Sequence, residues 1–239
     1  MKPLAGLLSL LATACTFLPR PTPVPLRAQF HEPAAPPKEL VVLLPGRHSL
    51  PSEFEREGFV DLVRTARPRA RIVVPDLHIG YYRNRSATER LHQDVILTAE
   101  AEGIGHITLV GISMGGLGAM LHELDHPGHV DELILLSPFL GDASVIDDIT
   151  AQGGLASWTP EGEAPDAFSR KLWTGLRESW LTRPDRPILR LGCGEADRLA
   201  SATRLAAADL LPAETLWIPG DHDWPTWNAL GRQLIQPAR

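Results

Sequence analysis

Residues 106–116 read HITLVGISMGG, and this stretch decides the fold that the sequence predicts. The apolar run Ile107–Val110 has the composition of a buried strand, and a helical stretch follows the glycines. Between them Gly111, Ser113 and Gly115 form a G-x-S-x-G pattern. Such a pattern between a strand and a helix predicts a sharp turn that lifts the serine hydroxyl clear of the sheet. The two glycines remove the Cβ clash that this turn would otherwise cause.

Further strands and helices alternate on both sides of this turn. The other apolar, strand-like runs are Leu40–Leu44, Ile72–Pro75, Leu133–Leu136, Ile188–Leu191 and Thr215–Ile218. The helical stretches are 52–66, 86–99, Met114–Leu124, Asp166–Leu181, Leu199–Leu210 and Thr226–Ile235. This alternation predicts an α/β fold with a doubly wound, mostly parallel sheet of about six strands and flanking helices. Ligands bind such sheets outside the carboxyl ends of the strands.

Two polar residues follow the last two strands at those ends. Asp197 lies in the loop after Ile188–Leu191, and His222 lies in the loop after Thr215–Ile218. A catalytic triad on such a sheet follows the chain order serine, acid, histidine, which is the order found here. Asp197 would orient the imidazole, and His222 would take the Ser113 proton and return it to the leaving group.

The chain resembles the α/β-hydrolase family in these motifs. The G-x-S-x-G turn, Gly-x-x-Asp ending at Asp197 and Gly-x-His ending at His222 match that family's layout over about residues 39–236. The resemblance implies a serine hydrolase that cleaves a small carboxylic ester through an acyl-enzyme, with no metal or organic cofactor. A thioesterase, lipase or amidase on the same scaffold remains an alternative, as does a non-catalytic binding lipoprotein.

The oxyanion of the reaction would need two backbone donors. The N–H of Met114, at the start of the helix after the turn, would be the first. The second is expected in the loop after the first strand, where relatives often carry a His-Gly pair. Here Pro45 stands in place of that histidine, and Gly46 permits close approach. We expect the N–H of Arg47 to complete the hole, with the N–H of His48 as the alternative.

Other acidic residues could orient the histidine. Glu195 lies two residues before Asp197, and Asp142 follows the strand Leu133–Leu136, where some family members place the acid. Asp221 and Asp223 flank the histidine and are expected to be solvated loop residues.

A metal-binding pattern overlaps the helix after the turn. His122 and His126 belong to an H-E-x-x-H string, which on a helix can hold zinc, and His129 follows. Asp125 puts a charge where zinc proteases keep apolar packing, and Pro127 would end the helix directly after the second histidine. We therefore predict an exposed, polar helix end and no metal site.

The longest connection covers about residues 141–187. Glycine, proline and acidic residues fill its first part, and a helical stretch with two tryptophans fills its second part. This composition predicts a short lid over the site. Trp158, Phe168 and Trp173 could line an acyl pocket or pack against the core.

The beginning of the chain indicates export. Residues 1–15 combine a basic start, a short apolar run and Ala-Thr-Ala before Cys15, which resembles a bacterial lipobox. We expect a signal peptide and a lipid anchor on Cys15 that holds the protein at the cell envelope. A periplasmic or secreted soluble protein is the alternative. The proline-rich residues 16–38 predict a linker, and residues 39–239 the hydrolase domain.

Charge and cysteine content bound the remaining possibilities. The net charge of −6 disfavours nucleic acid, whose phosphates need a clustered basic surface. If Cys15 carries lipid, Cys193 remains unpaired, and its apolar surroundings predict a buried, inert thiol.

Overall fold

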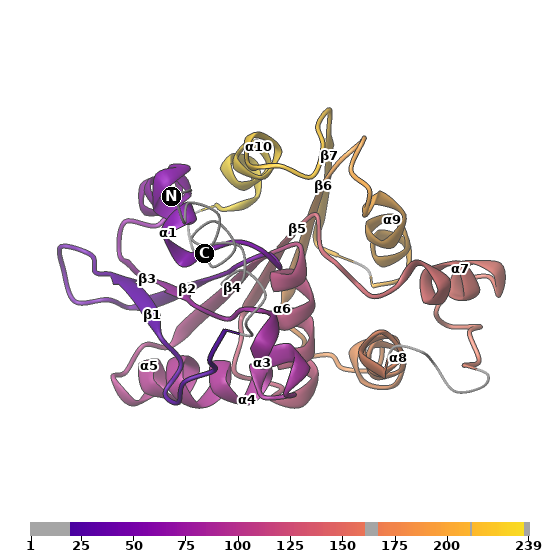
Figure 1. Cartoon of the computed structure of the whole chain (residues 1–239), viewed down its shortest axis with the longest axis horizontal. Coiled ribbons are helices and arrows are strands. Elements are labelled where there is room, and N and C mark those ends of the chain that lie inside the picture. Colours follow the sequence, from indigo (N-terminus) through magenta and orange to yellow (C-terminus); the bar gives the residue numbers. More distant parts are fainter. Residues whose placement is uncertain (1–19, 161–166, 211, 237–239) are drawn as a thin grey trace, which may run out of the picture.

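The computed structural model describes residues 20–160, 167–210 and 212–236. These residues contain a seven-stranded sheet in the order β1-β3-β2-β4-β5-β6-β7 (Figure 1). Strand β1 pairs antiparallel with β3, and the other neighbours pair parallel. The strands are β1 (Ala28–His31), β2 (Glu39–Leu44), β3 (Ala70–Pro75), β4 (His106–Ile112), β5 (Glu132–Leu136), β6 (Ile188–Gly194) and β7 (Glu214–Ile218). The doubly wound α/β fold predicted from the alternation is confirmed.

Helices cover both faces of the sheet. One face carries α1 (Pro51–Arg56), α2 (Phe59–Ala66) and α10 (Trp224–Leu234). The other carries α3 (Ile79–Arg83), α4 (Ala87–Leu91), the π-helical turn η2 (His92–Ile96), α5 (Leu97–Ala101), α6 (Met114–Asp125), α7 (Ala143–Ala151), α8 (Ala167–Gly175), the π-helical turn η3 (Leu176–Trp180) and α9 (Ala200–Asp209). None of the described helices is long and apolar enough to cross a membrane.

The core lies in two layers, one on each face of the sheet. In β2, Val41 and Leu43 pack under α1 and α2, while Leu40, Val42 and Leu44 pack toward α6. All five are fully buried. Successive side chains of a strand point to opposite faces, so a strand covered on both sides is apolar throughout. This explains why continuous apolar runs located the central strands.

The prediction that residues 16–38 form a linker is wrong for the part of this segment that packs on the domain. Residues 20–31, here called the N-terminal strap, pack on the domain and end in β1. Tyr81 Oη donates to the carbonyl oxygen of Pro23 at 2.9 Å, and the Leu26 N–H donates to Asp94 at 2.7 Å. Proline keeps its carbonyl acceptor although it lacks an N–H, so a proline-rich segment can still be held by donors on the domain. Strand β1 then pairs with β3 at the sheet edge and is the seventh strand.

The connection between β5 and β6 is built largely as core. The side chains of Trp158, Trp173 and Trp180 are buried, and the indole N–H of Trp173 donates to the Leu140 carbonyl at 2.7 Å. Trp158 and Trp173 therefore pack against the core instead of lining a pocket, whereas Phe168 does line one. Residues 161–166 of the expected lid lie outside the described residues.

A chain of buried charges joins the amino ends of the strands. Arg67 contacts Glu39 of β2 and Glu132 of β5. Glu132 also accepts from Arg190 of β6 at 2.6 Å, and Arg190 reaches Glu214 of β7 at 2.7 Å. These side chains lie at the opposite end of the sheet from the loops that follow the strands, so they leave the carboxyl ends free for a site.

Candidate active site

Ser113 occupies the strained turn that the sequence predicts. It follows β4 directly, and its backbone angles are φ 52° and ψ −116°. A Cβ on Gly111 would lie 2.6 Å from the backbone of Gly115, and one on Gly115 would lie 2.1 Å from the Leu44 carbonyl oxygen. The backbone thus approaches too closely for any larger residue at either position. Helix α6 begins at Met114, and the serine stands at the carboxyl edge of the sheet.

Three side chains form a continuous hydrogen-bonded chain at this edge. The Nε2 atom of His222 lies 3.0 Å from the Oγ of Ser113. The Nδ1 atom of His222 lies 2.8 Å from Oδ2 of Asp197 and 3.0 Å from its Oδ1. A base in contact with a serine hydroxyl, and itself oriented by a carboxylate, can accept the serine proton. The structure brings together the three residues that the sequence singled out.

Close backbone packing brings the two loops of this chain together. A Cβ on Gly194 would lie 2.4 Å from the carbonyl oxygen of Gly220, so the end of β6 and the loop after β7 are in direct contact. The Ala196 N–H also donates to that carbonyl at 3.0 Å. Contact at this distance sets the spacing between Asp197 and His222.

Helix α10 fixes the histidine loop from its other side. Asp223 caps this helix by accepting from the Thr226 N–H at 3.0 Å. The imidazole of His222 packs edge-on against Trp227, with ring centroids 5.1 Å apart. Asp223 was expected to be a solvated loop residue. It is exposed, and its capping role follows from its position three residues before a threonine at a helix start.

The carboxylate of Asp197 is held in its charged form. Burial alone would raise its pKa, but hydrogen bonds with His222 and with the Leu199 N–H outweigh burial and lower the pKa of Asp197. The Leu199 N–H lies 2.8 Å from Oδ1. A buried carboxylate that stays ionised can stabilise an imidazolium on its neighbour.

Backbone donors for an oxyanion lie beside the serine. Arg47, His48, Met114 and Ser113 line one cavity of about 390 Å³. A Cβ on Gly46 would lie 3.5 Å from the Cβ of Ser113, so the loop after β2 passes directly against the serine. Among the described residues, neither the Arg47 N–H nor the His48 N–H donates to a backbone carbonyl. Both remain available to a ligand, and the choice between them stays a prediction.

Most of the sheet, the turn and the loops that carry the site match one family model. The model of the alpha/beta hydrolase family covers residues 41–238. The chain belongs to the α/β-hydrolase family. A search of curated protein sequences gave no significant match.

Solved structures of other α/β hydrolases share the fold. S-formylglutathione hydrolase FrmB from Staphylococcus aureus is 20% identical with a TM-score of 0.57, covering 84% of this chain and 80% of that one. The fluorophosphonate-binding serine hydrolase FphF from the same organism is 17% identical with a TM-score of 0.56, covering 87% and 90%. A monoacylglycerol lipase from Paleococcus ferrophilus is 17% identical with a TM-score of 0.56, covering 88% and 96%.

The alternative acids of this α/β hydrolase lie apart from the imidazole. Asp142 precedes α7 and lines the cavity, and Glu195 and Asp221 are exposed. None of the three approaches Nδ1 of His222 within hydrogen-bonding distance in the described structure, where Asp197 occupies that position.

Helix α3 supplies residues that the sequence did not single out as part of the site. Tyr82 is buried against α6, and its Oη lies 3.3 Å from the Met114 carbonyl oxygen. A Cβ on Gly118 would lie 2.3 Å from this Oη, so the small residue admits the phenol. Helix α3 lines the cavity through Ile79, Tyr82 and Arg83. A five-residue helix is too short for hydrophobic periodicity to reveal.

The H-E-x-x-H string of this α/β hydrolase does not form the exposed helix end that was expected. Helix α6 ends at Asp125, before Pro127, but His122 and Glu123 are fully buried. Glu123 pairs with Arg183 at 2.8 Å. His122 packs against His92 and His126, and burial, aided by His126, lowers its pKa to about 3. Within the described ranges no three histidine, cysteine or acidic side chains are arranged to hold a metal ion.

Cys193 lies in β6 next to this site but is fully buried. Burial raises the pKa of its thiol. A protonated, inaccessible thiol is a poor nucleophile, so the Ser113 hydroxyl is the candidate nucleophile that lines the cavity.

Proposed function

We propose that this α/β hydrolase cleaves carboxylic esters through an acyl-enzyme formed on Ser113. One observation carries the proposal: the unbroken chain from Ser113 Oγ through His222 to Asp197, with bonds of 3.0 and 2.8 Å. A binding protein would have no use for a base in contact with a strained, cavity-facing serine. The triad supplies both proton transfers that ester hydrolysis requires.

In the first half of the reaction, Ser113 Oγ attacks the ester carbonyl carbon while His222 takes its proton. The carbonyl oxygen becomes an oxyanion, held by the N–H groups of Met114 and Arg47. The tetrahedral intermediate then expels the alcohol, which receives the proton from His222. The serine now carries the acyl group.

In the second half, water replaces the alcohol. His222 takes a proton from water, and the hydroxide attacks the acyl carbon. Collapse of the second intermediate breaks the bond to Ser113, returns a proton to its Oγ and releases the carboxylic acid. Asp197 remains ionised throughout and stabilises each imidazolium.

A fluorophosphonate probe tests the nucleophile directly. We expect the wild-type chain to be labelled and Ser113→Ala to be unlabelled, with hydrolysis of p-nitrophenyl acetate lost in parallel. Ser201→Ala is the matched control, because Ser201 is an exposed serine on α9 that is not part of the triad. A folded wild-type protein that takes no label would contradict the proposal and favour a non-catalytic binding protein.

Substrates with different scissile bonds distinguish an esterase from a thioesterase, lipase or amidase with the same fold. We expect esters to be hydrolysed faster than matched anilides, whose leaving groups are poorer. Faster cleavage of thioesters, the class to which the substrate named for FrmB belongs, would reassign the protein as a thioesterase. Faster cleavage of long-chain glycerides would favour a lipase, the activity named for the Paleococcus protein.

We further propose that the protein is anchored at the cell envelope through lipid on Cys15, which lies outside the described residues. The lipobox-like residues before it support this proposal. Metabolic labelling with an alkyne fatty acid should modify the wild type and Cys193→Ala but not Cys15→Ala. Label retained in Cys15→Ala, or no label in the wild type, would contradict the anchor.

A further inference from the structure

The lining of the cavity beside Ser113 carries more positive than negative charge. Arg47, Arg83 and Arg198 line it, with Asp142 as the one carboxylate in the lining. The chain as a whole carries a net charge of −6. The charge at the cavity is therefore opposite in sign to that of the molecule.

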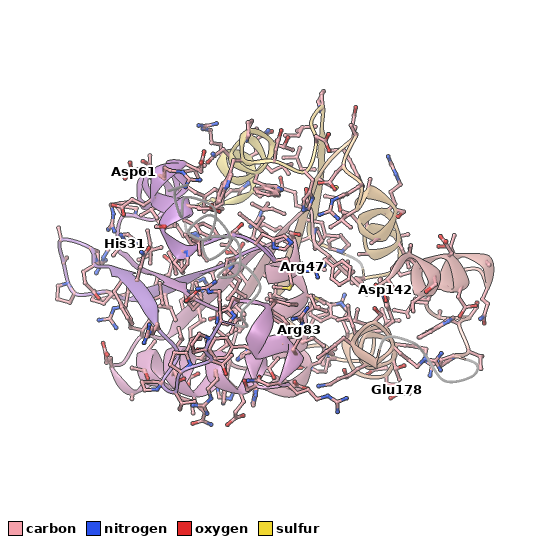
Figure 2. The ribbon with its side chains drawn as sticks, in the orientation of Figure 1. His31, Arg47, Asp61, Arg83, Asp142 and Glu178 are labelled. Carbon is pink, nitrogen blue, oxygen red and sulfur yellow. The ribbon has the colours of Figure 1, made fainter. Side chains whose placement is uncertain are left out.

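The three guanidinium groups come from different parts of the fold. Arg47 belongs to the loop after β2, Arg83 ends α3, and Arg198 follows Asp197 in the loop after β6. Figure 2 labels Arg47, Arg83 and Asp142, with Arg83 on α3 and Asp142 next to the start of α7. Three separate elements of the fold thus each contribute an arginine to the lining of the cavity that contains Ser113.

These arginines are free to bind a ligand. All three are exposed, and none of their guanidinium groups makes a hydrogen bond or ion pair with another residue in the described part of the chain. Several arginines elsewhere are held by acids: Arg71 contacts Glu102 at 2.6 Å and Arg90 contacts Asp94 at 3.2 Å. Asp142 shares the cavity without pairing with any of the three. The cavity thus presents several guanidinium groups whose N–H donors are not bound to other side chains.

We propose that the natural substrate is an ester that carries a second, anionic group, a carboxylate or a phosphate, bound by Arg83 and Arg198. This inference rests on the proposed esterase activity. The planar guanidinium matches the oxygens of either anion and can donate two parallel hydrogen bonds to it. A positive cleft in a negative protein also concentrates anions near the reacting atoms.

The floor of the cavity fits the rest of such a molecule. The same cavity has an apolar lining made by Ile79, Met114, Leu117, Phe139 and Leu199. A short hydrocarbon segment between the ester and the anion would cover this floor. The reacting carbonyl would then lie at Ser113, and the charged end of the substrate would lie at Arg83 and Arg198.

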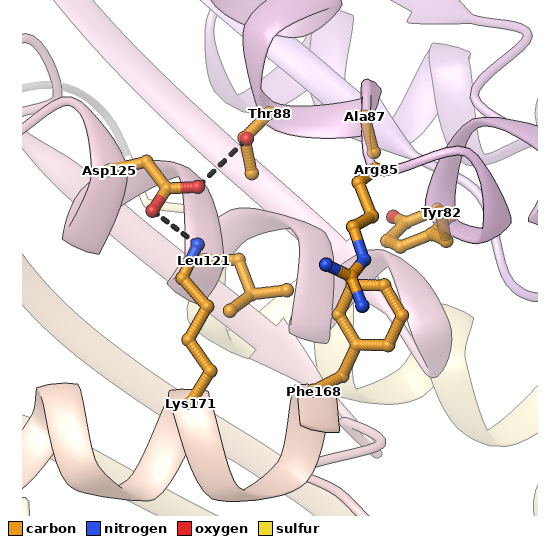
Figure 3. Close-up of a pocket in the computed structure, with 8 residues that line it drawn as sticks. All are labelled: Tyr82, Arg85, Ala87, Thr88, Leu121, Asp125, Phe168 and Lys171. Atoms are coloured by element: carbon orange, nitrogen blue, oxygen red, sulfur yellow. Dashed lines mark hydrogen bonds and ion pairs between the residues drawn. The ribbon is translucent and has the colours of Figure 1, made fainter. Parts of the chain in front are cut away.

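A neighbouring cavity continues the same charge pattern. It measures about 210 Å³ and shares Tyr82 and Phe168 with the first (Figure 3). In it Asp125 is already held by Lys171 at 2.6 Å and by Thr88 at 2.9 Å. Figure 3 shows the Arg85 side chain extending over Phe168, and among the described residues no carboxylate pairs with it. A longer anionic substrate would find a further guanidinium there.

The attraction between exposed arginines and an anionic substrate is screened by salt. This predicts how the kinetics should depend on salt and on the substrate. The attraction decays over about 8 Å at physiological salt, so added salt should weaken it. Because the anion lies away from the reacting bond, the arginines should bind the ground state and transition state alike. The preference should therefore be expressed mainly in KM.

Matched ester pairs test the proposal. In the first pair the anion is in the acyl part: the p-nitrophenyl monoester of glutaric acid against p-nitrophenyl valerate. In the second it is in the alcohol part: p-acetoxybenzoate against p-acetoxybenzamide. We expect kcat/KM for the anionic member of at least one pair to exceed that of its neutral partner about tenfold at low salt. The pair that shows it identifies the side of the ester that carries the anion.

Charge-removing variants attribute the preference to the named residues. Arg83→Gln and Arg198→Gln should each lower the anionic-to-neutral ratio about fivefold, and NaCl should lower it in the wild type. Asp142→Asn should raise the ratio. Arg232→Gln is the control, because this substitution removes the same charge from an exposed position on α10.

The outcomes separate this inference from the proposed function. Equal kcat/KM within both pairs would overturn the inference, and so would a preference that survives both arginine variants. In either case fluorophosphonate labelling of Ser113 would still support the esterase. Loss of labelling in the wild type would instead overturn the esterase itself.

Discussion

Gly194 and Gly220 touch through their backbones: a Cβ on Gly194 would lie 2.4 Å from the Gly220 carbonyl oxygen. This contact joins the loop that carries Asp197 to the loop that carries His222. The alignment of the triad therefore depends on two residues that have no side chain and take no part in proton transfer.

Gly194→Ala should separate these loops. We expect a loss of about a hundredfold in kcat, because small displacements of a catalytic group have effects of this size. Thermal unfolding should show a folded protein, and slower fluorophosphonate labelling should accompany the loss. Wild-type kcat in the Gly194→Ala variant would show that the loops can move apart without harm.

Asp197→Asn should remove the charge that orients and stabilises His222. Loss of the equivalent charge in a serine-protease triad lowers kcat about ten-thousandfold, and we expect a loss of that order in ester hydrolysis. Glu195→Gln is the matched control, since Glu195 is exposed two residues away. A larger loss in Glu195→Gln than in Asp197→Asn would mean that the acid has been assigned to the wrong residue.

Arg67→Met should destabilise the protein without touching the site. The change leaves Glu39 and Glu132 buried without their shared cation, and breaking a buried pair in this way costs about 3–5 kcal/mol. Urea unfolding measures the loss. Arg69→Met, an exposed neighbour, should change stability little. Equal stability of the two variants would contradict a structural role for the buried charges.

His122 should make the protein less stable in acid. Its pKa falls from 6.5 to about 3 on folding, so between these values the unfolded chain binds a proton that the folded chain does not. Stability is therefore fully present above pH 6.5 and is lost as pH falls toward 3, by at most about 1.4 kcal/mol per pH unit for this group. In His122→Leu the urea midpoint should depend less steeply on pH. An unchanged slope would exclude His122 as its source.

The parts of the fold that sequence could predict are those with strong local signals. Strands such as Ile107–Val110 are apolar throughout because helices cover both faces of the sheet, and Ser113, Asp197 and His222 follow strands in an order that this topology requires. Residues whose type and position both carry information, such as the glycines of the turn, can therefore be predicted from the sequence.

The parts that could not be predicted depend on contacts between distant segments. The prolines of the N-terminal strap suggest a linker until the donors on Tyr81 and the acceptor on Asp94 are known. His122 looks like a surface residue until η2 places His92 against it. The positive charge around the cavity is also hidden in the sequence, because Arg47, Arg83 and Arg198 are widely separated and meet only in three dimensions.

The N-terminal strap changes what an anchor on Cys15 would do. Only residues 16–19 separate that cysteine from Arg20, which is bound to Asp76, so a taut tether would reach about 17 Å. The strap contacts α3 through Tyr81, and α3 also lines the cavity through Tyr82 and Arg83. An anchor on Cys15 would therefore keep α3, and the side of the cavity that it lines, within a short reach of the membrane. Substrate could then arrive by lateral diffusion along the membrane, and releasing the strap would change which esters the enzyme meets.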